Sequence, residues 1–207
     1  MRTRYVAFPL SLVIVLGGCL TTSGPRKPPA LSALQREAMQ TKEISGDFET
    51  VFASVLSVLQ DDGWQITEIA KDSGVIQANS LKRQALVGPE DDWRSPQDPS
   101  LKSIEKGAAI AQRKGLEFAT WTRWKQLTAH IEPWGTKTVR VRISIVKYGT
   151  LPSGTQVRET GKLFSHTKQV KVAGKEQSVI LEAPRPYQLL FQKIEKAVFV
   201  RKGLSGS

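Results

Sequence analysis

The sequence predicts an α+β fold, a two-layer sandwich in which an antiparallel β-sheet has two helices packed on one face. Two segments, one near residue 50 and one near residue 195, carry apolar residues at helical spacing. Between them, a long segment alternates apolar and polar residues, as strands with one buried and one exposed face do. Because the helices and the sheet each have an apolar face to cover, we expect them to form two packed layers.

The first helix is predicted in the segment DFETVFASVLSVLQDDG. Asp47 is placed to cap its N-terminus, and Gly63 is placed to end it. The apolar stripe of this helix consists of Phe48, Val51, Phe52, Val55, Leu56 and Leu59. We expect the folded domain to begin at Gly46, just before the helix, and to span residues 46–203.

Strands are expected directly after this helix. WQITEI and GVIQAN flank the turn-rich AKDS and predict a hairpin. Two long strands are predicted in FATWTRWKQLTAHIEPW and TVRVRISIVKYG, with Gly135 at the turn between them. One or two weaker strands are expected around Gly161. The residues of the second long strand that should face the helices are Val139, Val141, Ile143 and Ile145.

The closing helix is predicted in APRPYQLLFQKIEKAVFVRKG, with Pro186 at its first position, where a missing N–H does no harm. Its apolar stripe consists of Leu190, Phe191, Ile194, Ala197 and Val198. This stripe gives the sheet a second helix on the same face.

Residues 81–115 do not fit the predicted sheet, and we interpret them as an insertion. The prolines and acids of VGPEDDWRSPQDPS predict a loop, and LKSIEKGAAIAQRKG predicts a short helix. Insertions of this length in compact domains tend to be either functional or mobile, and the sequence leaves that choice open.

The N-terminus has the features of an export signal. Arg2 and Arg4 precede an apolar run over residues 7–16, which is shorter than the roughly 20 residues that span a bilayer. The last residue of this run and the three residues after it resemble the lipobox of bacterial lipoproteins, in which an aliphatic residue and two small residues precede an acylated cysteine: Leu16, Gly17, Gly18 and Cys19. Cys19 is the only cysteine of the chain. The alternatives are an ordinary signal peptide with a chance cysteine and a buried thiol in a core strand.

The lipoprotein resemblance implies that residues 1–18 are removed and that acyl chains, palmitate among them, anchor Cys19 in a membrane. Two or more such chains give stable anchoring. Leu20, rather than aspartate, follows the cysteine, which resembles the pattern that Gram-negative lipoproteins of the outer membrane share. We therefore expect an outer-membrane anchor with the domain facing the periplasm. Residues 19–45, rich in proline, serine and threonine, are expected to be the lipidated tether, with a short helix over residues 30–41 as an open alternative.

The chain is strongly basic, with a formal net charge of +11. Such a charge favours anionic partners and says little about fold. In a cell envelope these partners are lipid headgroups, phosphates of glycolipids and cell-wall carboxylates. Nucleic acid is not an expected partner for an exported chain.

The first helix, the hairpin QITEIAKDSGVIQA and the closing YQLLFQKIEKAVFV together are similar to small envelope lipoproteins of the BamC-like, helix-grip type. The similarity spans most of the domain and consists of hydrophobic patterns. It implies a helix-grip-like fold and a non-catalytic accessory role beside envelope protein partners, with the membrane reached through the N-terminal lipid.

We expect no enzyme activity, no metal site and no cofactor, because no arrangement of reactive residues is recognisable. The two histidines, His130 and His166, fall on different predicted strands without a third ligand at a recognisable spacing. Three successive acids, Glu90, Asp91 and Asp92, lack the ligand alternation of a calcium loop and are interpreted as a solvated turn.

The stretch WTRWK is the strongest candidate for a contact surface. On a strand, Trp121, Arg123 and Lys125 share one face, while Thr122 and Trp124 share the other. Aromatic and basic side chains side by side suit glycans, anionic headgroups or a protein partner. The alternative is that one tryptophan packs in the core and the other shields an edge.

Two functions follow as hypotheses. The first is an outer-membrane-anchored lipoprotein that acts as a non-catalytic accessory or scaffold component of an envelope protein assembly. The alternative is a periplasmic carrier lipoprotein for a lipid or a small ligand. The bulky apolar residues expected between helices and sheet favour the first hypothesis, because such sets usually fill the space they enclose.

Overall fold

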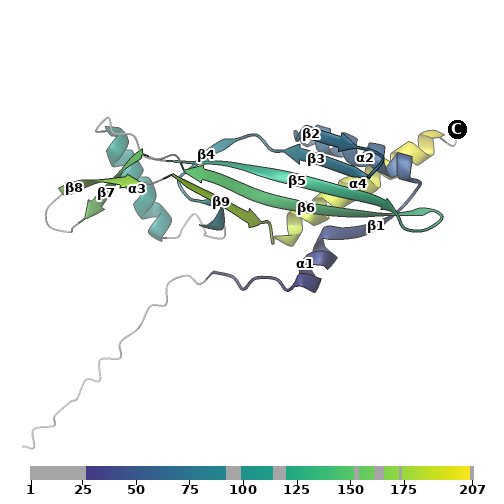
Figure 1. The fold of residues 1–207 in the computed structure, drawn as a ribbon, viewed down its shortest axis with the longest axis horizontal. Helices are drawn as coiled ribbons and strands as arrows, with labels where there is room; N and C mark the ends of the chain where they lie inside the picture. The colour runs from purple at the N-terminus through teal and green to yellow at the C-terminus, as the bar shows by residue number, and fades with distance from the viewer. Residues whose placement is uncertain are drawn as a thin grey trace, which may run out of the picture.

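The structure of this chain, a computed structural model, describes residues 27–91, 99–113, 120–151, 154–160, 166–172 and 174–205. A seven-stranded antiparallel sheet forms one layer, and two helices, α2 (Phe48–Asp61) and α4 (Pro184–Ser205), lie together against one of its faces (Figure 1). The α+β sandwich predicted from the sequence is therefore confirmed.

The bounds of the other described elements are as follows. The remaining helices are α1 (Ala33–Gln40) and α3 (Pro99–Arg113), with a 3-10 turn, η1 (Pro89–Asp91). The strands of the large sheet are β1 (Thr41–Ser45), β2 (Gln65–Ala70), β3 (Val75–Asn79), β4 (Arg83–Ala85), β5 (Trp121–Pro133), β6 (Thr138–Leu151) and β9 (Lys175–Ile180). Two further strands, β7 (Gly154–Thr160) and β8 (His166–Val172), form a separate two-stranded sheet among the described residues.

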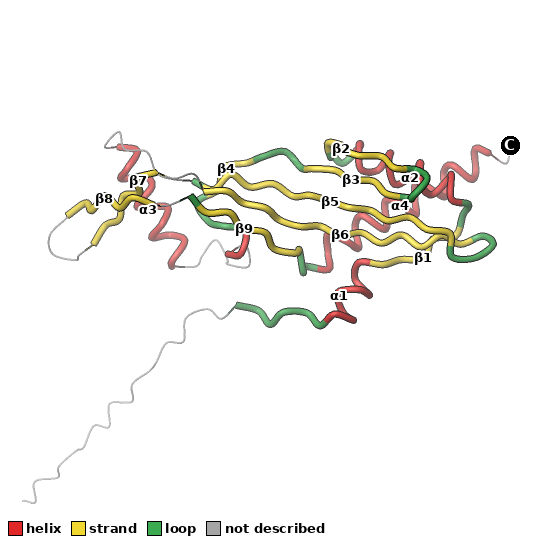
Figure 2. The backbone as a smooth tube through the Cα atoms, in the orientation of Figure 1, coloured by secondary structure: helices red, strands yellow, loops and turns green. Residues whose placement is uncertain are grey.

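Two long strands, β5 and β6, form the hairpin at the centre of the large sheet (Figure 2). The strand order is β1-β6-β5-β3-β2, with β9 pairing to β6 and β4 pairing to β5. Each long strand is therefore flanked by two short strands in succession, β6 by β1 and then β9, and β5 by β3 and then β4. The sheet consequently extends well beyond the helices toward β7, β8 and α3, which lie at the opposite end of the molecule (Figure 1).

The core lies between the sheet and helices α2 and α4. The residues of the two long strands that lie under the helices are at most 3% exposed: Leu127, Ala129, Ile131, Val139, Val141, Ile143 and Ile145. They pack in one cluster with the apolar stripes of both helices, which include Val55, Leu59, Phe191 and Ile194. Both the predicted stripes and the predicted inner face of β6 are confirmed.

Helix α2 begins where the sequence predicts. The Asp47 carboxylate accepts a hydrogen bond of 2.8 Å from the backbone N–H of Thr50, which satisfies a free donor in the first turn. This hydrogen bond stabilises the charged carboxylate and lowers the pKa of Asp47. At the other end, Gly63 adopts φ +77, a conformation that favours glycine.

The N-terminal boundary differs from the expected start at Gly46. Residues 41–45 form the edge strand β1, in which Ile44 pairs with Val139 and is 3% exposed. Preceding this strand, α1 is fixed by a 2.8 Å salt bridge between Arg36 and Glu182. Helix α1 and strand β1, which were expected to be part of the tether of residues 19–45, therefore belong to the folded domain. Backbone pairing at a sheet edge needs few apolar side chains, so the pattern of TKEIS gave no strand signal.

The expected insertion, residues 81–115, is also partly built into the sheet. Its first residues form β4, which pairs with β5, and the helix α3 matches the predicted short helix. Strand β9 was not predicted, because KEQSVI is mostly polar. Helix α4 begins at Pro184, two residues before Pro186, so both prolines fall in the first turn, where N–H groups have no helical partner. No helix in the described part of the chain is both long and apolar enough to cross a membrane.

Candidate functional site

Two separate regions of described side chains pack on the face of the sheet that carries the helices. The first is the main core under α2 and α4. The second is a small cluster at the other end, where Trp121, 9% exposed, packs with Pro89 and Gly149. A Cβ atom on Gly149 would lie 2.6 Å from Pro89 Cδ and 3.0 Å from the Trp121 ring, so this cluster admits only glycine at that position.

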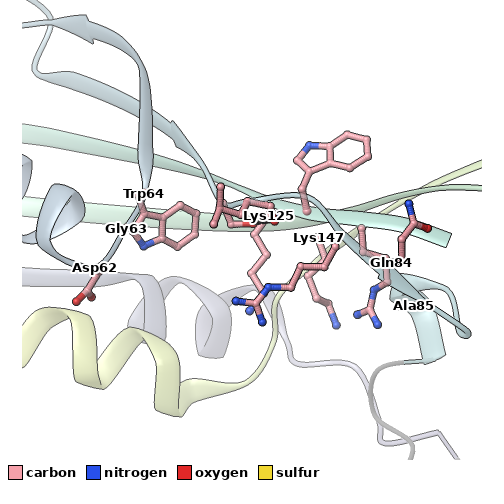
Figure 3. A pocket seen from close by; sticks show the side chains of 12 residues that line it. Asp62, Gly63, Trp64, Gln84, Ala85, Lys125 and Lys147 are labelled. Atoms are coloured by element: carbon pink, nitrogen blue, oxygen red, sulfur yellow. Dashed lines mark hydrogen bonds between the residues drawn. The ribbon is translucent and has the colours of Figure 1, made fainter.

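A groove of about 540 Å³ lies between these two packed regions. It is bounded by the end of α2, the link from β3 to β4, and the adjoining parts of β4, β5 and β6. Figure 3 shows Trp64 at one end of the groove, Lys125 and Lys147 in the middle, and Gln84 and Ala85 at the other end. The lining residues are Asp62, Gly63, Trp64, Ser80, Leu81, Arg83, Gln84, Ala85, Arg123, Trp124, Lys125 and Lys147.

Strand alternation directs four cations into this groove. Lys147 continues the inner face of β6 one step beyond Ile145, where the covering helices have ended. In register, Lys125 lies opposite Lys147, and Arg123 lies opposite Arg83. Like charges directly opposite each other on antiparallel strands are destabilising. The sheet nevertheless has two such pairs next to each other.

The described residues that line the groove include one carboxylate beside these four cations. Of the described residues that line the groove, Asp62 alone carries a carboxylate, and it forms a salt bridge with Lys193 of α4. Arg123 and Lys147 make further interactions. Within the described part of the chain, the side chains of Arg83 and Lys125 form no hydrogen bond or salt bridge, and both residues are exposed.

Apolar side chains supply one wall of the groove. Trp64 follows the turn at Gly63, is half-buried against the main core, and is held by a backbone hydrogen bond of 2.9 Å from its N–H to the carbonyl of Leu59. Leu81, on the link from β3 to β4, is 58% exposed. The groove therefore combines an aromatic surface with positive charge, which suits a ligand that has both a ring and an anionic group.

The structure separates the four contact residues predicted in WTRWK. Arg123 and Lys125 lie in the groove. Trp121 is buried, which matches the core-packing alternative. The Trp124 ring points to the opposite face of the sheet, where it stacks on Tyr148 at a centroid distance of 5.4 Å.

Sequence reasoning did not single out Arg83, Lys147 or Trp64. Arg83 joins the site only because β4 pairs with β5, and no pattern in residues 81–115 predicts that pairing. Lys147 could have been found from the sequence, because it places a charge at one of the apolar positions of a long alternating strand. Such an interruption marks the place where the covering layer ends.

The residues considered for metal binding do not come together among the described residues. His130 is exposed on β5 of the large sheet, whereas His166 lies on β8 of the separate two-stranded sheet. Glu90 is exposed in η1, next to Asp91, and Asp92 lies outside the described residues, as does the predicted lipidation site Cys19. No group of three or more His, Cys, Asp or Glu within the described ranges could hold a metal ion.

Comparisons with known proteins give no assignment, because no family model and no curated protein matches this chain.

Proposed function

We propose that this chain is a lipid-anchored lipoprotein of the outer membrane, and that its domain works by binding, as a non-catalytic accessory or scaffold component of an envelope protein assembly. Two surfaces are available for contact. One is the basic groove. The other is the outer face of β5 and β6, where side chains such as Trp124, His130 and Tyr148 are exposed or half-exposed.

The filled interior is the observation that carries this proposal. A carrier of this architecture would hold its ligand between helices and sheet, in a mostly apolar cavity of roughly 300–1,000 Å³. That space is occupied by side chains: Tyr187, Ile143 and Ile194 are 0% exposed. The groove of about 540 Å³ has the size of a ligand site, but it is lined by cations and lies beyond the core. This arrangement favours contact with charged envelope components over enclosure of a lipid.

The tether between the predicted lipid anchor and the folded domain would be short. The domain begins near Leu31, whose N–H donates to a carboxylate oxygen of Glu182 at 3.4 Å. Residues 19–30 then separate the predicted lipid from the domain, and twelve residues reach at most about 40 Å when fully extended. Such a tether would hold the domain near the membrane surface while leaving its contact surfaces accessible.

Replacing Cys19 with serine is expected to move the chain from the membrane fraction to the soluble fraction. Serine cannot form the thioether, and without acyl chains no stable anchor remains. Fractionation of cells with a carbonate wash measures the distribution. Thr22→Ser, three residues away, is the matched control and should stay with the membrane. A Cys19→Ser chain that remains in the washed membrane would contradict the lipid anchor.

Site-specific photocrosslinking in intact cells tests the scaffold role. A photoreactive residue at His130, on the outer sheet face, or at Leu81, in the groove, should give adducts with envelope components, including a protein at one position or both. Leu34, 79% exposed on α1, is the control and should give none. Adducts with lipid alone would favour the carrier, and identical adducts from all three positions would contradict a specific contact surface.

A further inference from the structure

We propose that the basic groove binds a phosphorylated saccharide, with Arg83 and Lys125 holding its phosphate groups and Trp64 packing against a sugar ring. This inference rests on the proposed binding function and names the ligand of one of its two surfaces. The outer sheet face remains for protein contact.

The charge arrangement is the first argument. Arg83 opposite Arg123 and Lys125 opposite Lys147 place four cations on one face of three neighbouring strands. Cβ atoms of directly opposite residues lie about 5 Å apart, and those of diagonal neighbours about 7–8 Å. A phosphate group spans such distances with several charge-assisted hydrogen bonds, and arginine suits its geometry in particular. An anion bound in the groove would therefore relieve the repulsion between these like charges.

The shape of the groove is the second argument. Its volume of about 540 Å³ matches a small ligand. Trp64 is held by the core on one side, so its exposed part offers a fixed aromatic surface for a sugar ring. A site for phosphate alone needs no such wall, and a site for an acyl chain would not place four cations along its length. A phosphorylated sugar ring would contact both the aromatic side and the cationic side of the groove.

The same chemistry has two sources in a cell envelope, the phosphorylated sugar headgroup of a membrane glycolipid and a soluble sugar phosphate. Calorimetric titration of the full-length chain in detergent distinguishes them. The probes are a glucosamine disaccharide with two phosphates, the same disaccharide without phosphate, and mixed micelles that contain a phosphorylated glycolipid. Tighter binding of the micelles identifies the membrane source, and equal binding identifies the soluble one.

The bisphosphorylated disaccharide should bind at least about tenfold more tightly than the unphosphorylated one, because charge-assisted hydrogen bonds supply most of the affinity. Arg83→Gln and Lys125→Gln should each weaken its binding about tenfold or more. Lys196→Gln removes the same charge from an exposed position of α4 and should change the affinity by less than about twofold, since exposed charges away from a site are screened. Trp64→Phe should weaken binding of the disaccharide and leave binding of pyrophosphate unchanged.

Thermal unfolding provides an independent readout. Without ligand, Lys125→Gln should raise the midpoint of unfolding, because it removes one like-charged pair, whereas Lys196→Gln should not. With the bisphosphorylated disaccharide, the midpoint of the unmodified chain should rise more than that of Lys125→Gln. A groove cation that lowers stability and raises affinity is a functional residue, whereas a merely structural one would show the opposite.

The results that overturn this inference are specific. Equal losses for Lys125→Gln and Lys196→Gln would show general electrostatic attraction. An acidic peptide that binds through Arg83 and Lys125 where the disaccharide does not would make the ligand a protein. Absence of phosphate binding, together with protein adducts from His130, would refute the saccharide and leave the scaffold function standing.

Discussion

Replacing Tyr187 with alanine should destabilise the domain by about 3–5 kcal/mol, the range for aromatic truncations in a packed core. Tyr187 is 0% exposed and lies on α4, against the sheet. Because small domains are stable by only about 5–15 kcal/mol, this variant should lose a large part of its stability.

The hydroxyl of Tyr187 completes the sheet edge where no strand pairs. Strand β1 pairs with β6 up to Arg142, and β9 begins to pair at Val146, so β6 has a gap between them. Tyr187 Oη donates to the carbonyl of Leu181 at 3.0 Å and accepts from the backbone N–H of Ile145 at 3.3 Å. A buried N–H in this gap would otherwise lack a partner.

Tyr187→Phe separates the two contributions, because it keeps the ring and removes the hydroxyl. It should cost about 1–3 kcal/mol, since it leaves buried polar groups without partners. Urea unfolding of Tyr187→Ala, Tyr187→Phe and the unmodified chain gives all three free energies. Equal stability of Tyr187→Phe and the unmodified chain would show that the hydroxyl contributes nothing to the sheet edge.

The difference in stability between the unmodified chain and Tyr187→Phe should also depend on pH. Burial raises the pKa of the Tyr187 phenol above its ordinary value of 10.0, because the ionised form is desolvated. The unfolded chain then loses this proton at a lower pH than the folded one, so the contribution to stability is complete below pH 10 and falls as the pH rises above it. The advantage of the unmodified chain over Tyr187→Phe should shrink accordingly.

Gly74→Ala should be the other strongly destabilising substitution, by roughly 4 kcal/mol or more, a size reserved for severe structural conflicts. Gly74 has φ +66, and its carbonyl accepts a 2.8 Å hydrogen bond from the N–H of Ile131. An added Cβ would lie 1.9 Å from the carbonyl oxygen of Ile131. Because that atom belongs to the backbone of β5, the turn would have to move away from the sheet.

Gly63→Ala is the matched control for this prediction. Gly63 also has a positive φ, +77, but no atom lies within 4 Å of its added Cβ. It should therefore show only the conformational cost of about 1–2 kcal/mol. Thermal and urea unfolding of both variants measure the difference. Equal losses would mean that backbone conformation alone, and not the close approach to β5, makes Gly74 necessary.

Most of the fold could be predicted from the sequence because its large elements carry strong local patterns. Helix α2 has an apolar stripe, a cap and a terminating glycine, and β6 alternates over nearly its whole length. Each pattern depends on residues close in the chain. The elements that were missed, β1, β4 and β9, are short edge strands with one or two inward apolar residues each, and backbone hydrogen bonds to a neighbour hold them in place.

The candidate site was predicted only in part, for a related reason. Arg123 and Lys125 attract attention within one short stretch. Their cross-strand neighbours, Arg83 and Lys147, lie about 40 and 20 residues away in the chain, and only the register of the sheet brings these four together. The sequence also could not decide which tryptophan of WTRWK is buried, because that depends on where η1 packs.

By itself, the sequence determined the amphipathic helices and the long hairpin, because hydrophobic periodicity is a local property of a chain. The tertiary structure decided where the helices end along the sheet, and hence which inward positions are covered and which form a groove. A lysine on the inner face of β6 would disrupt the packing under a helix, whereas beyond the helices it lines the groove. That distinction depends on which segments lie above the strand, and residues near in sequence do not specify it.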